Sequence, residues 1–191
     1  MLIGRLLSPV HVLGPGNRVC LWTQGCSRQC PGCVSPELQP FCGKNVDEDA
    51  VGVILEKVAQ NRKCSGLTVS GGDPFAQSES LLKLLMRVRE IFSDILVYTG
   101  FTLKEIRSGS AGNAGIACLD YIDVLIDGPY LEELNTPDCI LRGSSNQIIN
   151  YFNNELRESY EEYMKHGRML ESFVHGQNII VAGIFNREES L

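Results

Sequence analysis

The chain has 191 residues, 43% hydrophobic and 21% charged, which predicts one globular domain and excludes a disordered, collagen-like or coiled-coil chain as a whole. Its 17 basic and 23 acidic residues give a net charge of −6, so nucleic acids and anionic membranes are poor partners for it. The sequence has no long apolar run and no secretion signal, and we expect a cytoplasmic protein without a membrane span.

The first half of the chain predicts a strand, a long irregular segment and a helix. Residues 18–23 are typical of a short buried strand, and residues 24–44 are rich in proline, glycine and cysteine. Loops of that length are usually functional. A helix should follow, because Val51, Ile54, Leu55 and Val58 repeat with helical spacing. Asn45 and Glu48 have the spacing of a capping box for that helix.

The rest of the chain alternates strands with helices. The predicted strands are residues 67–70, 95–98, 121–126 and 178–185. The predicted helices are residues 81–92, 102–107 and 154–172, with a loop of small residues at 108–115. This alternation indicates an α/β fold with a mostly parallel sheet. Residues 151–191 are expected to cap the same single domain, whose core spans about 13–150.

Four of the predicted strands end in segments that combine glycine with polar or reactive side chains. The segments are 23–26 (Thr-Gln-Gly-Cys), 70–73 (Ser-Gly-Gly-Asp), 98–100 (Tyr-Thr-Gly) and 126–128 (Ile-Asp-Gly). In parallel sheets, sites form just beyond the carboxyl ends of the strands. We therefore expect the four segments to converge on one site.

Eight cysteines make the composition unusual. Cys26, Cys30 and Cys33 lie within eight positions, in the pattern C-x3-C-x2-C. Disulfides are rare in the cytosol, so this crowding suggests metal or redox chemistry. The other five are expected to be buried small residues and not ligands: Cys20, Cys42, Cys64, Cys118 and Cys139.

Several kinds of site compete for the three crowded cysteines. Structural zinc needs four ligands, and none of the histidines, at 11, 166 and 175, falls in the loop. A redox pair formed by Cys30 and Cys33 would leave Cys26 unexplained. A [4Fe–4S] cluster usually takes four thiolates. Three thiolates would leave one iron open, which is a place for a substrate.

At this point the sequence resembles a known family. The cysteine spacing, followed by Gly71-Gly72-Asp73-Pro74 after the next strand, resembles radical S-adenosylmethionine (SAM) enzymes. Further blocks are similar to the branch that activates anaerobic ribonucleoside-triphosphate reductases. They are residues 13–18 (LGPGNR), 24–26 (QGC), 30–33 (CPGC), 98–100 (YTG), 123–129 (DVLIDGP) and 142–147 (RGSSNQ).

The resemblance implies a fold and a reaction. The fold would be a partial (β/α) barrel of radical SAM type, with mostly parallel strands. Cys26, Cys30 and Cys33 would bind a [4Fe–4S] cluster, and SAM would chelate the open iron. Reductive cleavage of SAM would give methionine and a 5′-deoxyadenosyl radical, which would abstract a glycine Cα hydrogen from a partner enzyme. The resemblance also implies reduced flavodoxin or ferredoxin as the electron donor.

The resemblance further implies residues that bind SAM. Gly71 and Gly72 would let the backbone approach the ligand. Asp73, one methylene shorter than the glutamate of the family's motif, would bind the SAM amino group. Gly32 stands where many members carry an aromatic residue, so adenine contacts would come from backbone and neighbouring loops. The other cofactor-binding candidates are Thr99, Asp127, Arg142 and Asn146.

Each candidate also has an ordinary structural interpretation. A Gly-Gly pair often only turns the chain, Asp127 can cap a neighbouring element, and Arg142 can belong to a solvated turn. The target is open as well. The protein would activate a glycyl-radical enzyme, the anaerobic reductase above all, or it would be a radical SAM maturase of another peptide or protein. A non-catalytic iron–sulfur or zinc protein would leave the Gly-Gly-Asp-Pro motif unexplained.

Overall fold

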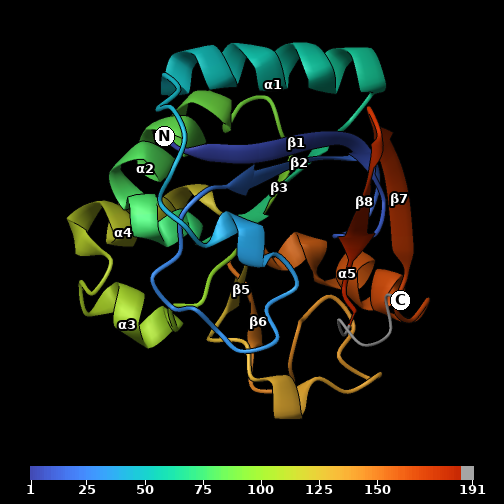
Figure 1. The fold of residues 1–191 in the computed structure, drawn as a ribbon. Helices are drawn as coiled ribbons and strands as arrows, with labels where there is room; N and C mark the ends of the chain where they lie inside the picture. The colour runs from blue at the N-terminus through green and yellow to red at the C-terminus, as the bar shows by residue number, and fades with distance from the viewer. Residues whose placement is uncertain (186–191) are drawn as a thin grey trace.

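The computed structural model describes residues 1–185, which form a mixed α/β fold around a six-stranded sheet (Figure 1). The strands follow one another across the sheet in chain order. They are β1 (Ile3–Val10), β2 (Arg18–Thr23), β3 (Gly66–Gly71), β4 (Asp94–Tyr98), β5 (Val124–Asp127) and β6 (Ile148–Tyr151). Strands β2 to β5 pair in parallel, and β1 and β6 pair antiparallel at the two edges. The predicted α/β class with a mostly parallel sheet is confirmed.

Five α-helices and five short 3-10 helices connect the strands in the described part of the chain. The α-helices are α1 (Glu48–Arg62), α2 (Ser78–Val88), α3 (Leu103–Arg107), α4 (Gly112–Cys118) and α5 (Arg157–Met164). The 3-10 helices are η1 (Pro36–Leu38), η2 (Pro74–Gln77), η3 (Leu119–Tyr121), η4 (Glu132–Leu134) and η5 (Asn154–Leu156). No helix within these residues combines the length and apolarity needed to cross a membrane.

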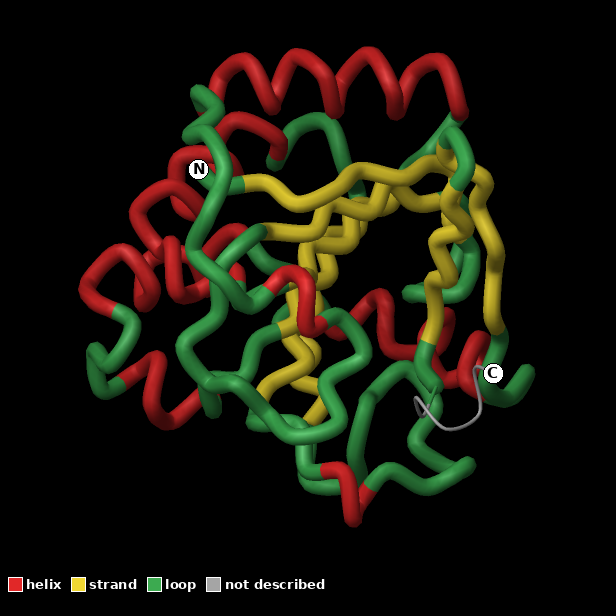
Figure 2. The backbone as a smooth tube through the Cα atoms, in the orientation of Figure 1, coloured by secondary structure: helices red, strands yellow, loops and turns green. Residues whose placement is uncertain are grey.

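The central strands are apolar because both of their faces are covered. Leu21 of β2, Val69 of β3 and Val97 of β4 belong to the core that α1, α2 and α4 pack on from one side of the sheet (Figure 2). The neighbouring residues along each strand point to the opposite face of the sheet. There Leu96 packs against Tyr160 of α5.

The start and the buried face of α1 differ from the prediction. Asp47, and not Asn45, is the N-cap, and its side chain accepts a hydrogen bond from the Ala50 amide at 3.0 Å. Asn45 instead forms a β-bridge with Leu2, which takes its backbone out of reach of the helix. Ile54 is half exposed, because the helix turns Val51, Leu55 and Ala59 toward the sheet.

Two predicted boundaries after α2 are also wrong. The loop expected at 108–115 contains the start of α4, where small residues let the helix pack closely: a Cβ added to Gly115 would lie 2.7 Å from Ala111 Cβ. The helix expected over 154–172 is only α5, and the chain turns at Gly167, whose φ is +75°. A strand, β7 (Leu170–His175), follows and pairs antiparallel with β8 (Asn178–Gly183). Strands β1, β6 and β7 have no counterpart in the prediction.

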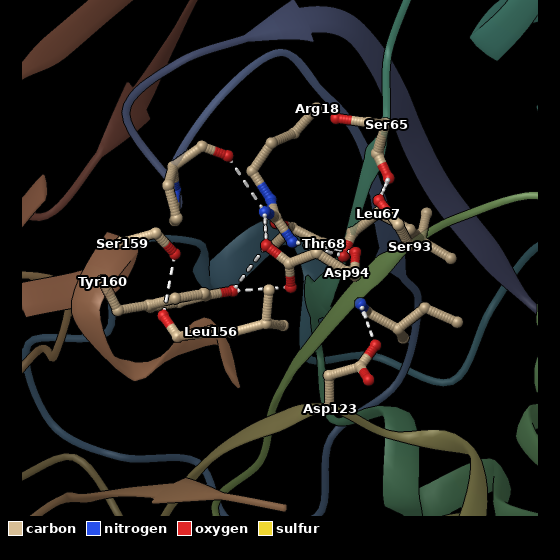
Figure 3. Close-up of polar contacts among 12 residues, drawn as sticks. Arg18, Ser65, Leu67, Thr68, Ser93, Asp94, Asp123, Leu156, Ser159 and Tyr160 are labelled. Carbon is tan, nitrogen blue, oxygen red and sulfur yellow. Dashed lines mark hydrogen bonds and ion pairs between the residues drawn. The ribbon is translucent and has the colours of Figure 1, made fainter. Parts of the chain in front are cut away.

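A buried polar network joins the amino-terminal ends of three parallel strands to α5 (Figure 3). Arg18 of β2 is fully buried, and its guanidinium donates to Asp94 of β4 at 2.5 Å and to Thr68 of β3 at 2.6 Å. The Tyr160 hydroxyl donates to the same Asp94 carboxylate at 2.8 Å. Burial would by itself lower the pKa of Arg18, but Tyr160 and Asp94 raise it above its ordinary value. The network therefore keeps a charge inside the protein.

Breaking this network from one side should be costly. Arg18→Met would leave the Asp94 carboxylate buried without its cation, and removing one partner of a buried pair costs about 3–5 kcal/mol. We expect urea unfolding to show a loss of that size. Adding Asp94→Asn to Arg18→Met should recover part of it. Lys165→Met, which removes an exposed pair with Glu162, should leave the urea midpoint unchanged. An unchanged midpoint for Arg18→Met would contradict the structural role of the network.

Candidate functional site

A large cavity lies beyond the carboxyl ends of the parallel strands. Its volume is about 970 Å³. All four segments that the sequence analysis singled out contribute to its lining, through residues 24 and 26, 70–73, 98–100 and 128. The structure thus brings together segments that are about a hundred residues apart in the chain, as expected for strand ends in a parallel sheet.

The cysteine loop forms one wall of this cavity. Cys26, Cys30 and Cys33 all line it, and all three are free, half-buried thiols. The loop is fixed at its base, where the Gly25 amide donates to Leu38 at 2.7 Å and the Cys26 amide donates to Gln39 at 2.8 Å. The apolar anchor is Leu38, which is buried. The long irregular segment is therefore tied to itself and to the end of β2.

The three thiols of the cavity wall offer sulfur donors for a metal centre. No three Cys, His, Asp or Glu side chains within residues 1–185 gather closely enough to hold one metal ion. In an iron–sulfur cluster each thiolate binds a different iron, so its thiolates stand farther apart than the ligands of one ion. Burial raises the pKa of the Cys26 thiol, which places this sulfur in a partly dehydrated site. Three free thiols on one cavity wall are the donor type that an iron–sulfur cluster uses.

The two glycines at the end of β3 are required by close backbone packing within the protein. A Cβ on Gly71 would lie 2.3 Å from the Thr23 nitrogen, and a Cβ on Gly72 would lie 2.2 Å from the Gly25 oxygen. These contacts are with backbone, which cannot move aside like a flexible side chain. The two glycines let the end of β3 press against the start of the cysteine loop. Their predicted approach to a ligand stays a prediction.

Asp73 joins the ends of β3 and β4. Its Oδ1 accepts from the Phe75 amide at 3.0 Å and from the Thr99 hydroxyl at 2.8 Å, and its Oδ2 accepts from the Gly100 amide at 3.0 Å. The carboxylate is almost fully buried, and burial raises its pKa. Asp73 and Thr99 are therefore held rigidly at the cavity wall.

Arg28 connects the cysteine loop to the segment after β4. Its guanidinium lies 4.7 Å from the ring centre of Phe101 and donates to Glu105 at 3.2 Å. The Nε atom is buried and has no hydrogen-bond partner within the described residues. This nitrogen lies beside Gly100, on the side of the Asp73 carboxylate. The loop is consequently anchored at its middle as well as at its base.

Four predicted site residues lie outside the lining of this cavity as far as residues 1–185 describe it: Gly32, Asp127, Arg142 and Asn146. Asp127 accepts from the Leu103 amide at 2.5 Å and from Asn150 at 2.9 Å, so it satisfies the first amide of α3, whose N-cap is Thr102. With Asn146, it lines a second, smaller hollow. Arg142 donates to the backbone carbonyl of Gln147 at 2.9 Å and closes its own turn. These contacts match the structural interpretations that the sequence left open.

Sequence reasoning missed the wall formed by the two ends of the chain. Residues 4–7 of β1 line the cavity, and so do residues 178–185 from β8 onward. Residues 178–185 were predicted as a strand, but no pattern in either segment indicates that β1 and β8 meet. Tyr98 was expected beside the site, where it is found, and its hydroxyl donates to the Leu141 carbonyl at 2.8 Å. Of the five scattered cysteines that were expected to be buried, four are buried, but the expectation is wrong for Cys42, which is exposed.

Known proteins resemble this chain over most of its length. Residues 12–150 match the family described as a 4Fe-4S single cluster domain. Three similar proteins are each named anaerobic ribonucleoside-triphosphate reductase-activating protein. The Escherichia coli K12 protein is 35% identical over 155 residues, covering 75% of this chain and 94% of that protein. The Pasteurella multocida protein is 37% identical over 148 residues, covering 74% and 91%. The Enterobacteria phage T4 protein is 32% identical over 144 residues, covering 72% and 86%.

The cluster should depend on the three cysteines of the cavity wall. After anaerobic reconstitution the parent protein should bind about four irons, the content of one cluster. Cys26→Ala, Cys30→Ala and Cys33→Ala should each lose stable iron binding, because each removes one of only three thiolates. Cys42→Ala removes an exposed thiol of the same loop and should bind iron like the parent. Stoichiometric zinc without iron uptake would contradict this assignment, and iron analysis with absorption spectroscopy decides it.

Proposed function

The chain belongs to the family of anaerobic ribonucleoside-triphosphate reductase-activating proteins, and from this premise we propose that it activates such a reductase by creating a glycyl radical in it. One observation carries the proposal. The three free thiols and the turn at 71–73 line the same cavity. Thiols for a cluster beside the Gly-Gly-Asp turn are the combination that the resemblance to radical SAM enzymes implies for the cleavage of SAM.

A bound cluster would supply the electron for reductive cleavage of SAM into methionine and a 5′-deoxyadenosyl group, and this cleavage would supply the acceptor for a hydrogen atom from a glycine Cα of the partner. Cys26, Cys30 and Cys33 would hold the cluster and leave one iron for SAM. The protein orients the reactants and excludes side reactions.

Asp73 is the residue that we assign to the SAM amino group. A carboxylate offers about four acceptor positions. Oδ1 already has two donors and Oδ2 has one, so Oδ2 retains capacity for a donor from the cavity. The ordered backbone from Thr99 to Gly100 holds the carboxylate in place for that contact. Roles for Gly32, Asp127, Arg142 and Asn146 toward SAM remain predictions, and their positions outside the cavity lining favour the structural alternatives.

The wider setting of the protein is also proposed. The parallel strands β2–β5 would form the wall of an incomplete (β/α) barrel, with the chain from 1 to 191 as one radical SAM domain. A cytoplasmic location suits free thiols that must remain reduced. The electron donor, reduced flavodoxin or ferredoxin, rests on the family resemblance alone.

The target can be tested by radical formation. When the reconstituted protein is mixed with SAM, a reduced donor and an anaerobic ribonucleoside-triphosphate reductase, a glycyl-type doublet should appear in the electron paramagnetic resonance spectrum. Replacing the radical-bearing glycine of the reductase by alanine should remove the doublet, because the hydrogen that is abstracted sits on that Cα.

Two results would redirect the proposal. Consumption of SAM without a radical on any glycyl-radical enzyme from the same cell would favour the maturase alternative. Absence of SAM cleavage by a protein with a full, reducible cluster would favour a non-catalytic iron–sulfur protein.

The assignment of Asp73 predicts a specific loss. Asp73→Asn keeps the size of the side chain but removes its charge, and SAM affinity should fall roughly 10- to 100-fold, the range for a charged hydrogen bond. Its iron content should match that of the parent. Asp127→Asn, at a carboxylate outside the cavity lining, is the matched control and should bind SAM nearly normally. Equilibrium dialysis with labelled SAM measures both variants, and the reverse ranking would move the amino-group partner to Asp127.

A further inference from the structure

The hairpin formed by β7 and β8 follows the segment that matches the iron–sulfur family, which ends at residue 150. It nevertheless forms a wall of the cavity that the three cysteines line. Consecutive residues of β8, from 178 to 183, all contribute to that wall. Because neighbouring side chains of a strand point to opposite faces, a wall made of consecutive residues means that the strand presents its edge.

The free edge of β8 has unpaired backbone groups. Strand β8 pairs only with β7 in the described part of the chain. The hairpin turns through residues 176 and 177, so the flanking pair, His175 and Asn178, is hydrogen-bonded. Hydrogen-bonded and non-hydrogen-bonded pairs alternate, which makes Val174–Ile179 and Ser172–Val181 non-hydrogen-bonded. The amides and carbonyls of Ile179 and Val181 therefore point away from β7, along the edge that lines the cavity.

A second strand edge lines the same cavity. Strand β1 is at the edge of the six-stranded sheet, and its consecutive residues 4–7 belong to the lining. Figure 1 shows β8 as the strand of the hairpin nearer to the central sheet, with β7 outside it. Within the described residues, both strand edges have N–H and C=O groups that pair with no other strand. An extended polypeptide can bind there, because its own C=O and N–H groups can hydrogen-bond to them.

The charges of the lining favour a neutral occupant next to SAM. The described lining contains the charged residues Arg5, Arg28, Glu37 and Asp73. Arg5 pairs with Glu37 and Arg28 pairs with Glu105, so both cations are already neutralised. A polyphosphate would lack strong partners here. The volume of about 970 Å³ is at the upper end for a ligand site and leaves room for a peptide segment beside the cofactor.

The outer face of the hairpin extends this surface. Val174 is 81% exposed, Ile179 is 70% exposed and Leu170 is 50% exposed. They share one face of the hairpin with Val181, and Ile179 and Val181 also line the cavity. An apolar stripe continuous with the cavity mouth indicates a protein partner that reaches into the site.

We propose that the free edge of β8 captures the glycine-bearing segment of the reductase as an added β-strand. This inference rests on the proposed function and assigns the β7–β8 hairpin as the element that recognises the partner. The added strand would hydrogen-bond to Ile179 and Val181, and its backbone would run toward the cysteine loop. A glycine in it presents a Cα without a side chain.

The test removes one outward amide from β8. Val181→Pro deletes an N–H that the hairpin does not use, and proline is tolerated at such edge positions. The dissociation constant for the reductase should rise roughly tenfold, the upper range for one net hydrogen bond. Ser172→Pro is the matched control, since it alters the paired residue on β7, whose amide faces the other edge. Val181→Thr keeps the shape and the amide, and it should bind like Ser172→Pro and the parent.

Hydrogen exchange on the parent protein gives a second measurement that requires no variant. Adding the reductase should slow exchange at the amides of Ile179 and Val181 and leave Ser172 and Val174 unchanged. Unchanged exchange at Ile179 and Val181 in a mixture that does form the glycyl radical would overturn the inference while the proposed function stands. Protection that grows with protein concentration in the absence of reductase would identify a second copy as the occupant and would also overturn it. Failure of the parent to form any glycyl radical would instead count against the proposed function.

Discussion

The arrangement of the site depends on the buried ion pair between Arg18 and Asp94, at the opposite end of the sheet. These residues are the first of β2 and β4, Gly66 of β3 lies between them in register, and Arg18 also donates to Thr68 of β3. The pair fixes the relative height at which the three strands begin. Strands of five or six residues that start in register also end in register. The residues that follow their ends, Gln24, Gly72 and Thr99, therefore line one cavity. A buried charge is tolerated there because Tyr160 and backbone carbonyls complete its hydrogen bonds.

At the end of the sheet that lines the cavity, Asp73 makes the polar contacts that join neighbouring strand ends. It binds its own turn through Phe75 and the next strand end through Thr99 and Gly100. Arg28 then ties the cysteine loop to that strand end through Phe101 and Glu105. A ligand that contacts the Asp73 carboxylate would therefore influence β3, β4 and the cysteine loop at once. This coupling gives a physical reason for an acidic residue at a position where it must be buried.

The sequence was most informative where the reactive residues lie close together in the chain. Three cysteines in eight residues and the turn at Gly71–Asp73 are readable without any long-range contact. The sequence was least informative where partners are distant. Asp127 at a strand end suits a ligand or a helix terminus, and only the structure shows that the Leu103 amide of α3 donates to it. Helix α5 ends at Met164, the chain then passes through the left-handed Gly167, and the pairing of β7 with β8 decides against a longer helix.

The two ends of the chain show why a family match over 12–150 leaves part of the site undescribed. The residues that would perform the chemistry lie in the parallel strands and in the cysteine loop, where the fold fixes them. The edge strands β1 and β8 carry none of that chemistry, yet they wall the same cavity with unpaired backbone. Backbone hydrogen bonding places few demands on side chains, so an edge can recognise a partner without leaving a motif. A recognition element of that kind is found through strand register and is invisible to a search for conserved residue types.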